Sequence, residues 1–153
     1  MICLGDGQAM AEQDRWKFIN DLDDELLKGG VILSEWCCFI IKDTDIAFVA
    51  GANLATIITA IAGIETHLRS EYGSDRRENL HQLIELSPLD GGLKGDLHNL
   101  RRYRNKWVHV SDPWDHQELL DQPEKYEREL EDMAMAAVRA LRRTIYDHHS
   151  QWI

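Results

Sequence analysis

Apolar positions recur at helical spacing near both ends of the chain. Over residues 14–28, Ile19, Leu22 and Leu26 fall on one helical face, and the two glycines that follow are typical of a helix end. A longer stripe over residues 123–148 predicts a final helix; its members are Tyr126, Leu130, Met133, Ala137, Leu141 and Ile145. Both segments are therefore expected to be amphipathic helices that bury one face.

The middle of the chain is more apolar and less periodic. Residues 31–43 fit either a buried strand or a buried helix, and because no partner strand is evident elsewhere we predict a helix. Asp43, Thr44 and Asp45 are expected to cap a second, long helix that runs to Tyr72.

The first part of that long helix, residues 46–64, carries no charge and is long enough for a membrane span. Its glycines, alanines and threonines argue against a span, as does the charged continuation through Glu65, His67 and Arg69. We therefore predict a central helix surrounded by others, and no membrane association.

Two shorter helical patterns occupy residues 78–86 and 93–110. The sequence SPLDGG between them forms a turn, and Pro113 ends the second pattern because proline disfavours the helical region for its predecessor. The chain is predicted to fold as one all-α bundle with four principal helices over residues 14–153, preceded by a disordered segment, residues 1–13.

The net charge of −10 argues against a general nucleic-acid coat protein, but the charge is uneven. Residues 69–106 hold eight cations and six anions, so a polyanion would be attracted there and repelled elsewhere. The three cysteines form no disulfide framework, which together with the absence of a secretion signal predicts a cytoplasmic protein. The histidines match no metal-binding spacing, so neither a metal nor a cofactor is expected.

The densest group of cations lies in LRRYRNKWVHVSDPWD, residues 100–115. It contains an arginine followed five positions later by a histidine, a spacing that is weak by itself because it occurs three times, at Arg76/His81, Arg104/His109 and Arg143/His148. Only the middle pair lies in the basic cluster and has an amide, Asn105, directly after the arginine.

RNKWVH resembles the R-N-x-x-x-H signature of HEPN domains, all-α bundles found in many prokaryotic ribonuclease toxins and defence proteins. The helix ending IETHLRSEYG (64–73), the turn and the motif helix are also similar to that family's layout. The resemblance implies a metal-independent RNA endonuclease that dimerises to form one composite cleft, with a possible antitoxin or defence partner protein. It makes Arg104 and His109 the catalytic pair and Asn105 their polar assistant.

The chemistry of these residues fits that transfer. Histidine can act as acid or base when the RNA 2′-hydroxyl attacks its own phosphate, and arginine stabilises the charge on the phosphate oxygens. Arg104 and His109 lie about 140° apart on an ideal helix, so a two-fold homodimer is expected to bring groups from both chains together. His109 is placed in the last helical turn, where the helix dipole favours its charged form.

Four further residues complete the expected site. Arg101, Arg102 and Lys106 are predicted to bind RNA, and Glu65 either supports Arg104 across the bundle or is an ordinary exposed helix acid. The alternative for the whole stretch is a solvated, basic helix end with Trp107 and Trp114 in the core. On that interpretation the protein is a non-catalytic helical interaction module.

Overall fold

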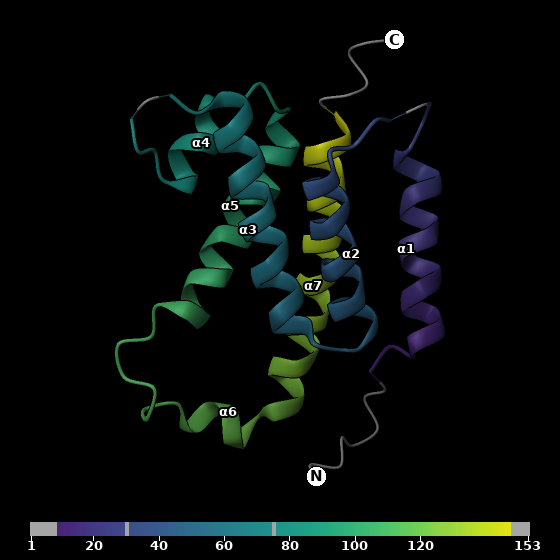
Figure 1. Cartoon of the computed structure of the whole chain (residues 1–153). Helices are drawn as coiled ribbons and strands as arrows, with labels where there is room; N and C mark the ends of the chain where they lie inside the picture. Colours follow the sequence, from purple (N-terminus) through teal and green to yellow (C-terminus); the bar gives the residue numbers. More distant parts are fainter. Residues whose placement is uncertain (1–8, 30, 75, 148–153) are drawn as a thin grey trace.

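The computed structural model describes residues 9–29, 31–74 and 76–147, and every regular element among them is an α-helix (Figure 1). This confirms the all-α class. In chain order the helices are α1 (Glu12–Leu26), α2 (Glu35–Val49), α3 (Asn53–Tyr72), α4 (Leu80–Leu86), α5 (Gly91–Val108), α6 (Gln117–Asp121) and α7 (Pro123–Asp147). Five of these helices, rather than the four expected, have fifteen or more residues.

The centre of the bundle is α3, which packs against α2, α4, α5 and α7. Figure 1 shows α1, α2, α3 and α7 running side by side, with α4 and α5 on the other flank of α3. Ile57, Ile61, Ile64 and Leu68 of α3 are all buried, at the spacing of one broad helical face. The prediction of a central helix surrounded by others is confirmed, and no helix in the described part of the chain is long and apolar enough to span a membrane.

The break between the two central helices lies elsewhere than predicted. Residues 43–45 are inside α2, where the Thr44 hydroxyl donates to the carbonyl of Ile40 at 2.7 Å, and they cap nothing. The chain turns instead at Gly51, whose φ of +79° is a left-handed conformation that glycine adopts without steric penalty. The helix α2 starts after Ser34, whose hydroxyl accepts a hydrogen bond from the Cys37 amide at 3.2 Å.

The ends of the chain differ in smaller ways. The helix α1 begins at Glu12, two residues before the expected start, and the Met10 amide donates to Glu131 at 2.9 Å. The short helix α6 was not anticipated. The structure does not describe residues 1–8, which include Cys3, nor Gly30, Asp75 and residues 148–153. The expected disorder of residues 1–8 and the expected helix end at His148 therefore stay predictions.

A buried arginine connects α1 to the rest of the bundle. Arg15 of α1 donates to the Phe48 carbonyl at 2.8 Å, to Asn53 at 2.8 Å and to Glu131 of α7 at 2.7 Å. Its guanidinium also lies over the Phe48 ring, 4.7 Å from the centroid. Through this one side chain, α1 is fixed to the α2–α3 turn and to α7.

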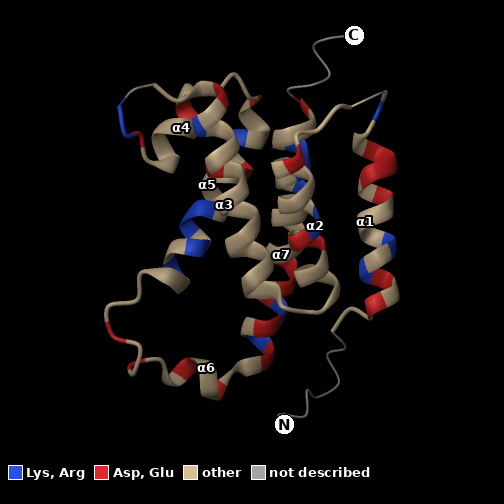
Figure 2. Ribbon diagram, in the orientation of Figure 1, with Lys and Arg blue, Asp and Glu red and all other residues tan. Residues whose placement is uncertain are grey.

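At its free end α5 diverges from α7, and α6 connects the two (Figure 1). The helix α6 contacts α7 among the described elements, while residues 109–116 link it to the end of α5. Figure 2 shows Lys and Arg concentrated on α5 and next to α4, and Asp and Glu spread along α1. The motif of residues 104–109 therefore lies at the open end of the bundle.

Candidate functional site

The motif occupies the C-terminal end of α5. Arg104 and Asn105 belong to the helix, whereas His109 is the residue that ends it, with φ −118° and ψ 49°. The His109 amide donates to the Asn105 carbonyl at 3.1 Å, so the two residues are one turn apart. We predicted that His109 lies in the last helical turn, but it follows that turn. The unpaired carbonyls of that turn still favour a positive charge nearby.

Arg104 is held by its neighbour Asn105. The Arg104 Nε donates to the Asn105 Oδ1 at 3.0 Å, and both side chains are half-buried. The bond uses Nε, and no other described residue accepts a hydrogen bond from this guanidinium, so both of its terminal nitrogens are left for a further acceptor. The Asn105 amide oxygen therefore orients the arginine.

The His109 side chain is exposed to solvent. Its imidazole takes part in no hydrogen bond or ion pair among the described residues. An imidazole in this position can exchange a proton with a bound molecule or meet a second copy of the chain.

The three predicted RNA-binding cations have different surroundings. Arg102 is exposed and donates to Asn99 at 2.7 Å, and Lys106, also exposed, lies 5.9 Å from the centroid of the Tyr103 ring. Arg101 is turned toward α4, with a terminal nitrogen 3.5 Å from His81 Nδ1. Arg102 and Lys106 are thus accessible to a polyanion, while Arg101 is part of a contact between helices.

Glu65 does not support Arg104. Its carboxylate accepts a hydrogen bond from Arg69, one turn along α3, at 2.8 Å. Both partners are partly exposed, so this is an ordinary pair on one helix that contributes little stability. Of the two interpretations of Glu65, the structure favours the helix-surface acid.

A histidine pair between α4 and α5 was not predicted. The rings of His81 and His98 are 4.8 Å apart, and His98 Nε2 lies 2.7 Å from the carboxylate of Glu85. The hydrogen bond with His98 lowers the pKa of Glu85 below its ordinary value. His81 and Glu85 are four residues apart on α4, a spacing visible in the sequence, but the approach of His98 depends on how α4 packs on α5. Among the described residues no three His, Cys, Asp or Glu side chains are placed to hold a metal ion.

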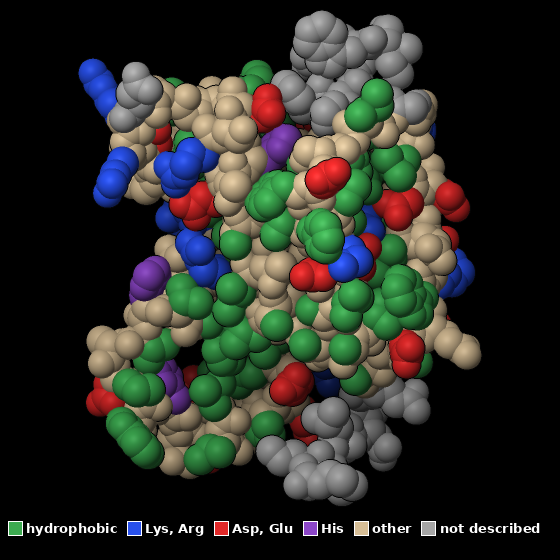
Figure 3. Space-filling model, viewed as in Figure 1, with side chains coloured by type: hydrophobic (Ala, Val, Ile, Leu, Met, Phe, Trp, Pro, Cys, Tyr) green, Lys and Arg blue, Asp and Glu red, His purple; other side chains and the backbone are tan. Residues whose placement is uncertain are grey.

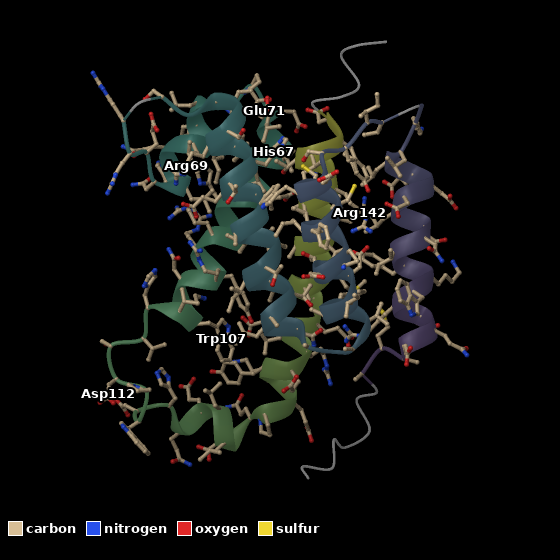
Figure 4. All side chains as sticks on the ribbon, viewed as in Figure 1. His67, Arg69, Glu71, Trp107, Asp112 and Arg142 are labelled. Carbon is tan, nitrogen blue, oxygen red and sulfur yellow. The ribbon has the colours of Figure 1, made fainter. Side chains whose placement is uncertain are left out.

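The two tryptophans of the stretch behave differently. Trp107 packs against the core from α5 and points into the space enclosed by α5, α6 and α7 (Figure 4). Trp114 is 95% exposed, so the part of the alternative interpretation that placed Trp114 in the core is wrong. Sequence reasoning also missed a cavity of about 550 Å³ between α5, α6 and α7, which Trp107 and Lys106 line.

The motif therefore combines an oriented arginine and an accessible histidine at a basic helix end next to a cavity. These groups suit the binding and proton chemistry of a phosphate ester. Comparison with known proteins assigns no relative: no family model, no curated protein sequence and no solved structure matches the chain.

Proposed function

We propose that this protein is a metal-independent RNA endonuclease of HEPN type, active in the cytoplasm as a component of a toxin or defence pair. The observation that carries the proposal is the Arg104–Asn105 hydrogen bond one turn before the exposed His109. A guanidinium oriented in this way is prepared for phosphate oxygens, and the neighbouring imidazole is accessible for proton transfer.

In the proposed reaction the RNA 2′-hydroxyl attacks the adjacent phosphorus and the 5′-oxygen leaves. His109 supplies or removes a proton at one of these oxygens, while Arg104 stabilises the charge on the non-bridging oxygens. Arg102 and Lys106, both exposed on the same helix, hold the backbone of the RNA. The products are a 2′,3′-cyclic phosphate and a free 5′-hydroxyl.

One copy of the chain supplies one Arg104 and one His109. The complete site is therefore proposed to form in a two-fold homodimer through the face that bears His109. Light scattering at micromolar concentration tests this assembly, and a monomer under those conditions contradicts the composite site. A partner protein that inhibits the enzyme is part of the same proposal.

The direct test of cleavage is incubation of end-labelled single-stranded RNA with the protein in EDTA. Products that end in 2′,3′-cyclic phosphate, formed in proportion to protein concentration, support the proposal. RNA that stays intact at high protein concentration contradicts it.

The competing function is a non-catalytic interaction module, and a specific observation favours it. The outer face of α2 and the segment before it expose large apolar side chains, with Ile32 88%, Phe39 62% and Ile46 54% accessible. Figure 3 shows apolar side chains over much of this view of the molecule. Together with the net charge of −10, such a surface suits a protein partner better than RNA. The absence of cleavage in the test above would favour the module.

A further inference from the structure

The outer sides of α2 and α3 form one surface that carries little charge. On α2, Phe39 is 62% and Ile46 54% exposed, and Ile32, shortly before the helix, is 88% exposed. The outward positions in the first half of α3 are also exposed and uncharged; they are Ala55, Ile58 and Ala62. Because α2 packs along α3, these positions form one surface, named here the α2–α3 face, and Figure 3 shows apolar side chains over much of this view. The uncharged run of residues 46–64 therefore contributes to an outer surface as well as to the core.

The size of the α2–α3 face matches one side of a protein interface. Its large apolar side chains are 37–88% exposed; they are Ile32, Trp36, Phe39, Ile46 and Ile58. At roughly 150–250 Å² for one large side chain, they leave on the order of 500 Å² of apolar surface in water. A standard interface buries about 800 Å² on each partner, of which about 56–65% is apolar. The apolar area of this face is thus what one ordinary interface covers.

The apolar pattern of the face is symmetric about Phe39. Ile32 precedes Phe39 by seven positions, and Ile46 follows it by seven. If a second α2 runs antiparallel with the two Phe39 side chains opposite each other, Ile46 of each copy comes near the partner's Ile32. The surface is then complementary to its own copy, as a two-fold interface requires.

The charges at one edge of α2 fit the same arrangement. Glu35 and Lys42 are both exposed, and on an ideal helix they lie about 20° apart, at roughly 100° per residue, so they share an edge. An antiparallel two-fold pair brings the same edge of both helices together, and each Glu35 then lies near the partner's Lys42. The complementary contact forms twice.

The position of Lys42 within one copy leaves it available for this contact. Its Nζ lies 4.5 Å from the centroid of the Phe39 ring, beside the proposed axis. It also lies 3.8 Å from the carboxylate of Asp43, but both side chains are more than half exposed. Such a surface pair contributes little stability, so Lys42 can turn to a second acid at little cost.

We propose that the α2–α3 face binds a second copy of the chain, with α2 packed antiparallel on the partner's α2 about a two-fold axis at Phe39. A different protein would also find apolar surface here, but its binding gives no reason for the symmetric spacing and the matching edge charges. Among the described helices α2 does not contact α5, so this interface is separate from the one proposed at His109. It needs neither RNA nor cleavage, and it goes beyond the proposed function.

The first test compares the mass of the full chain and two variants by light scattering at micromolar concentration. Phe39→Asp places two carboxylates against each other at the axis, so the wild type should have at least twice the mass of this variant. Leu86→Asp is the matched control, because Leu86 is 56% exposed on α4, away from α2, and its mass should equal that of the wild type. Circular dichroism checks that both variants keep their helix content.

The second test exchanges the edge charges and depends on the antiparallel arrangement. Lys42→Glu alone faces two acids with two acids, and Glu35→Lys alone faces two cations with two cations. Each should weaken self-association by roughly 5- to 30-fold, the range for two surface pairs changed from attraction to repulsion. A mixture of the two variants should pair preferentially as heterodimers, because each mixed pair restores both complementary contacts. Native mass spectrometry with one variant isotope-labelled measures the ratio.

These outcomes also separate this interface from the one proposed at His109. A Phe39→Asp chain that is half the mass of the wild type and is still a dimer supports both interfaces. A Phe39→Asp monomer supports the α2–α3 interface and contradicts the composite site at His109. Equal masses of wild type and Phe39→Asp, or random pairing in the mixture of Lys42→Glu and Glu35→Lys, overturn the proposal.

Discussion

The guanidinium of Arg142 donates two parallel hydrogen bonds to the Asp45 carboxylate, at 2.8 and 2.7 Å. Its Nε donates a third bond to Asp23, also at 2.8 Å, and Arg142 is 1% exposed. One side chain of α7 therefore holds carboxylates of α1 and α2 within the bundle (Figure 4). Desolvation lowers the pKa of Arg142, but the hydrogen bonds that it donates to Asp45 and Asp23 outweigh this effect and raise the pKa above the ordinary value.

Replacing Arg142 should strongly destabilise the fold. Arg142→Met keeps much of the side-chain volume but leaves Asp23 and Asp45 without their cation, so the free energy of unfolding should fall by about 3–5 kcal/mol. The neighbouring Arg143 pairs with Asp96 in a more exposed position, and Arg143→Met should lower it by less than about 1 kcal/mol. Urea denaturation measures both values, and similar losses for the two variants contradict the assignment.

The contacts of Arg142 with Asp23 and Asp45 lead to a prediction about the pKa of Asp45. Burial raises the pKa of Asp45 above its ordinary value, and Arg142 offsets this only in part. The folded chain therefore takes up a proton at Asp45 at a higher pH than the unfolded chain does. Taken alone, this group's contribution to the free energy of unfolding rises as the pH falls through the folded pKa and levels off below the unfolded one. Carbon-detected NMR should place its midpoint above that of aspartate in an unstructured peptide; a lower midpoint contradicts the inference.

Two helical glycines should respond in opposite ways to an added methyl group. A Cβ on Gly63 of α3 would lie 2.6 Å from Ile40 Cγ2, so Gly63→Ala forces α2 and α3 apart and should destabilise by about 1–3 kcal/mol. A Cβ on Gly95 of α5 meets nothing within 4 Å, and Gly95→Ala should stabilise by roughly 0.5–1 kcal/mol. Thermal unfolding followed by circular dichroism distinguishes the two, and equal shifts in melting temperature would contradict the close α2–α3 packing.

The helices could be predicted where one apolar face alternates with a polar one. The α7 stripe is of this kind, and Leu130, Ala137, Leu141 and Ile145 of it are buried. The α2–α3 boundary could not be predicted, because an apolar run on both sides of Gly51 removes the periodicity that marks an end. Buried arginines are equally hidden from pattern analysis, since charged residues are expected outside unless their partners are known.

Only the part of the candidate site that lies on the single helix α5 could be predicted from the sequence. The positions of Arg104, Asn105 and His109 follow from the helical pattern, but the bond between the Arg104 and Asn105 side chains does not. The cavity depends on contacts between α5 and residues about twenty positions later, such as Tyr126. No local spacing encodes that approach, so Tyr103 was interpreted as neither a core nor a site residue.

The two tryptophans of the basic stretch should differ in their effect on stability. Trp107 is partly buried against the core, so Trp107→Ala should destabilise by less than the roughly 3–5 kcal/mol of a fully buried ring, yet by more than about 1 kcal/mol. Trp114 is almost fully exposed, and Trp114→Ala should change stability by no more than about 0.5 kcal/mol. Denaturant titration of both variants tests this, and a large loss for Trp114→Ala would mean that residues 109–116 pack differently.

The catalytic assignment predicts that substitutions in α5 divide by role. His109→Ala should reduce RNA cleavage by about 100- to 10,000-fold, the range for loss of a general acid or base. Because His109 is exposed, its melting temperature should be nearly unchanged. The neighbouring Val108 is also exposed, and Val108→Ala is the control that should retain cleavage. A folded His109→Ala dimer that cleaves at the wild-type rate would remove His109 from the mechanism.

Lysine in place of Arg104 should not restore RNA cleavage. Arg104→Lys keeps the positive charge but loses both the planar fork and the Nε that donates to Asn105, so its activity should resemble that of Arg104→Ala. Asn105→Ala leaves the guanidinium without its anchor, and it should lower turnover more than it weakens RNA binding, because the charge remains while its orientation is lost. Arg102→Ala should do the reverse, weakening binding and reducing its salt dependence while turnover at saturation persists. Single-turnover cleavage and filter-binding measurements over a range of salt concentrations separate these effects. If loss of activity follows loss of melting temperature across all four variants, the basic end of α5 is a structural surface and the interaction module becomes the better account of this protein.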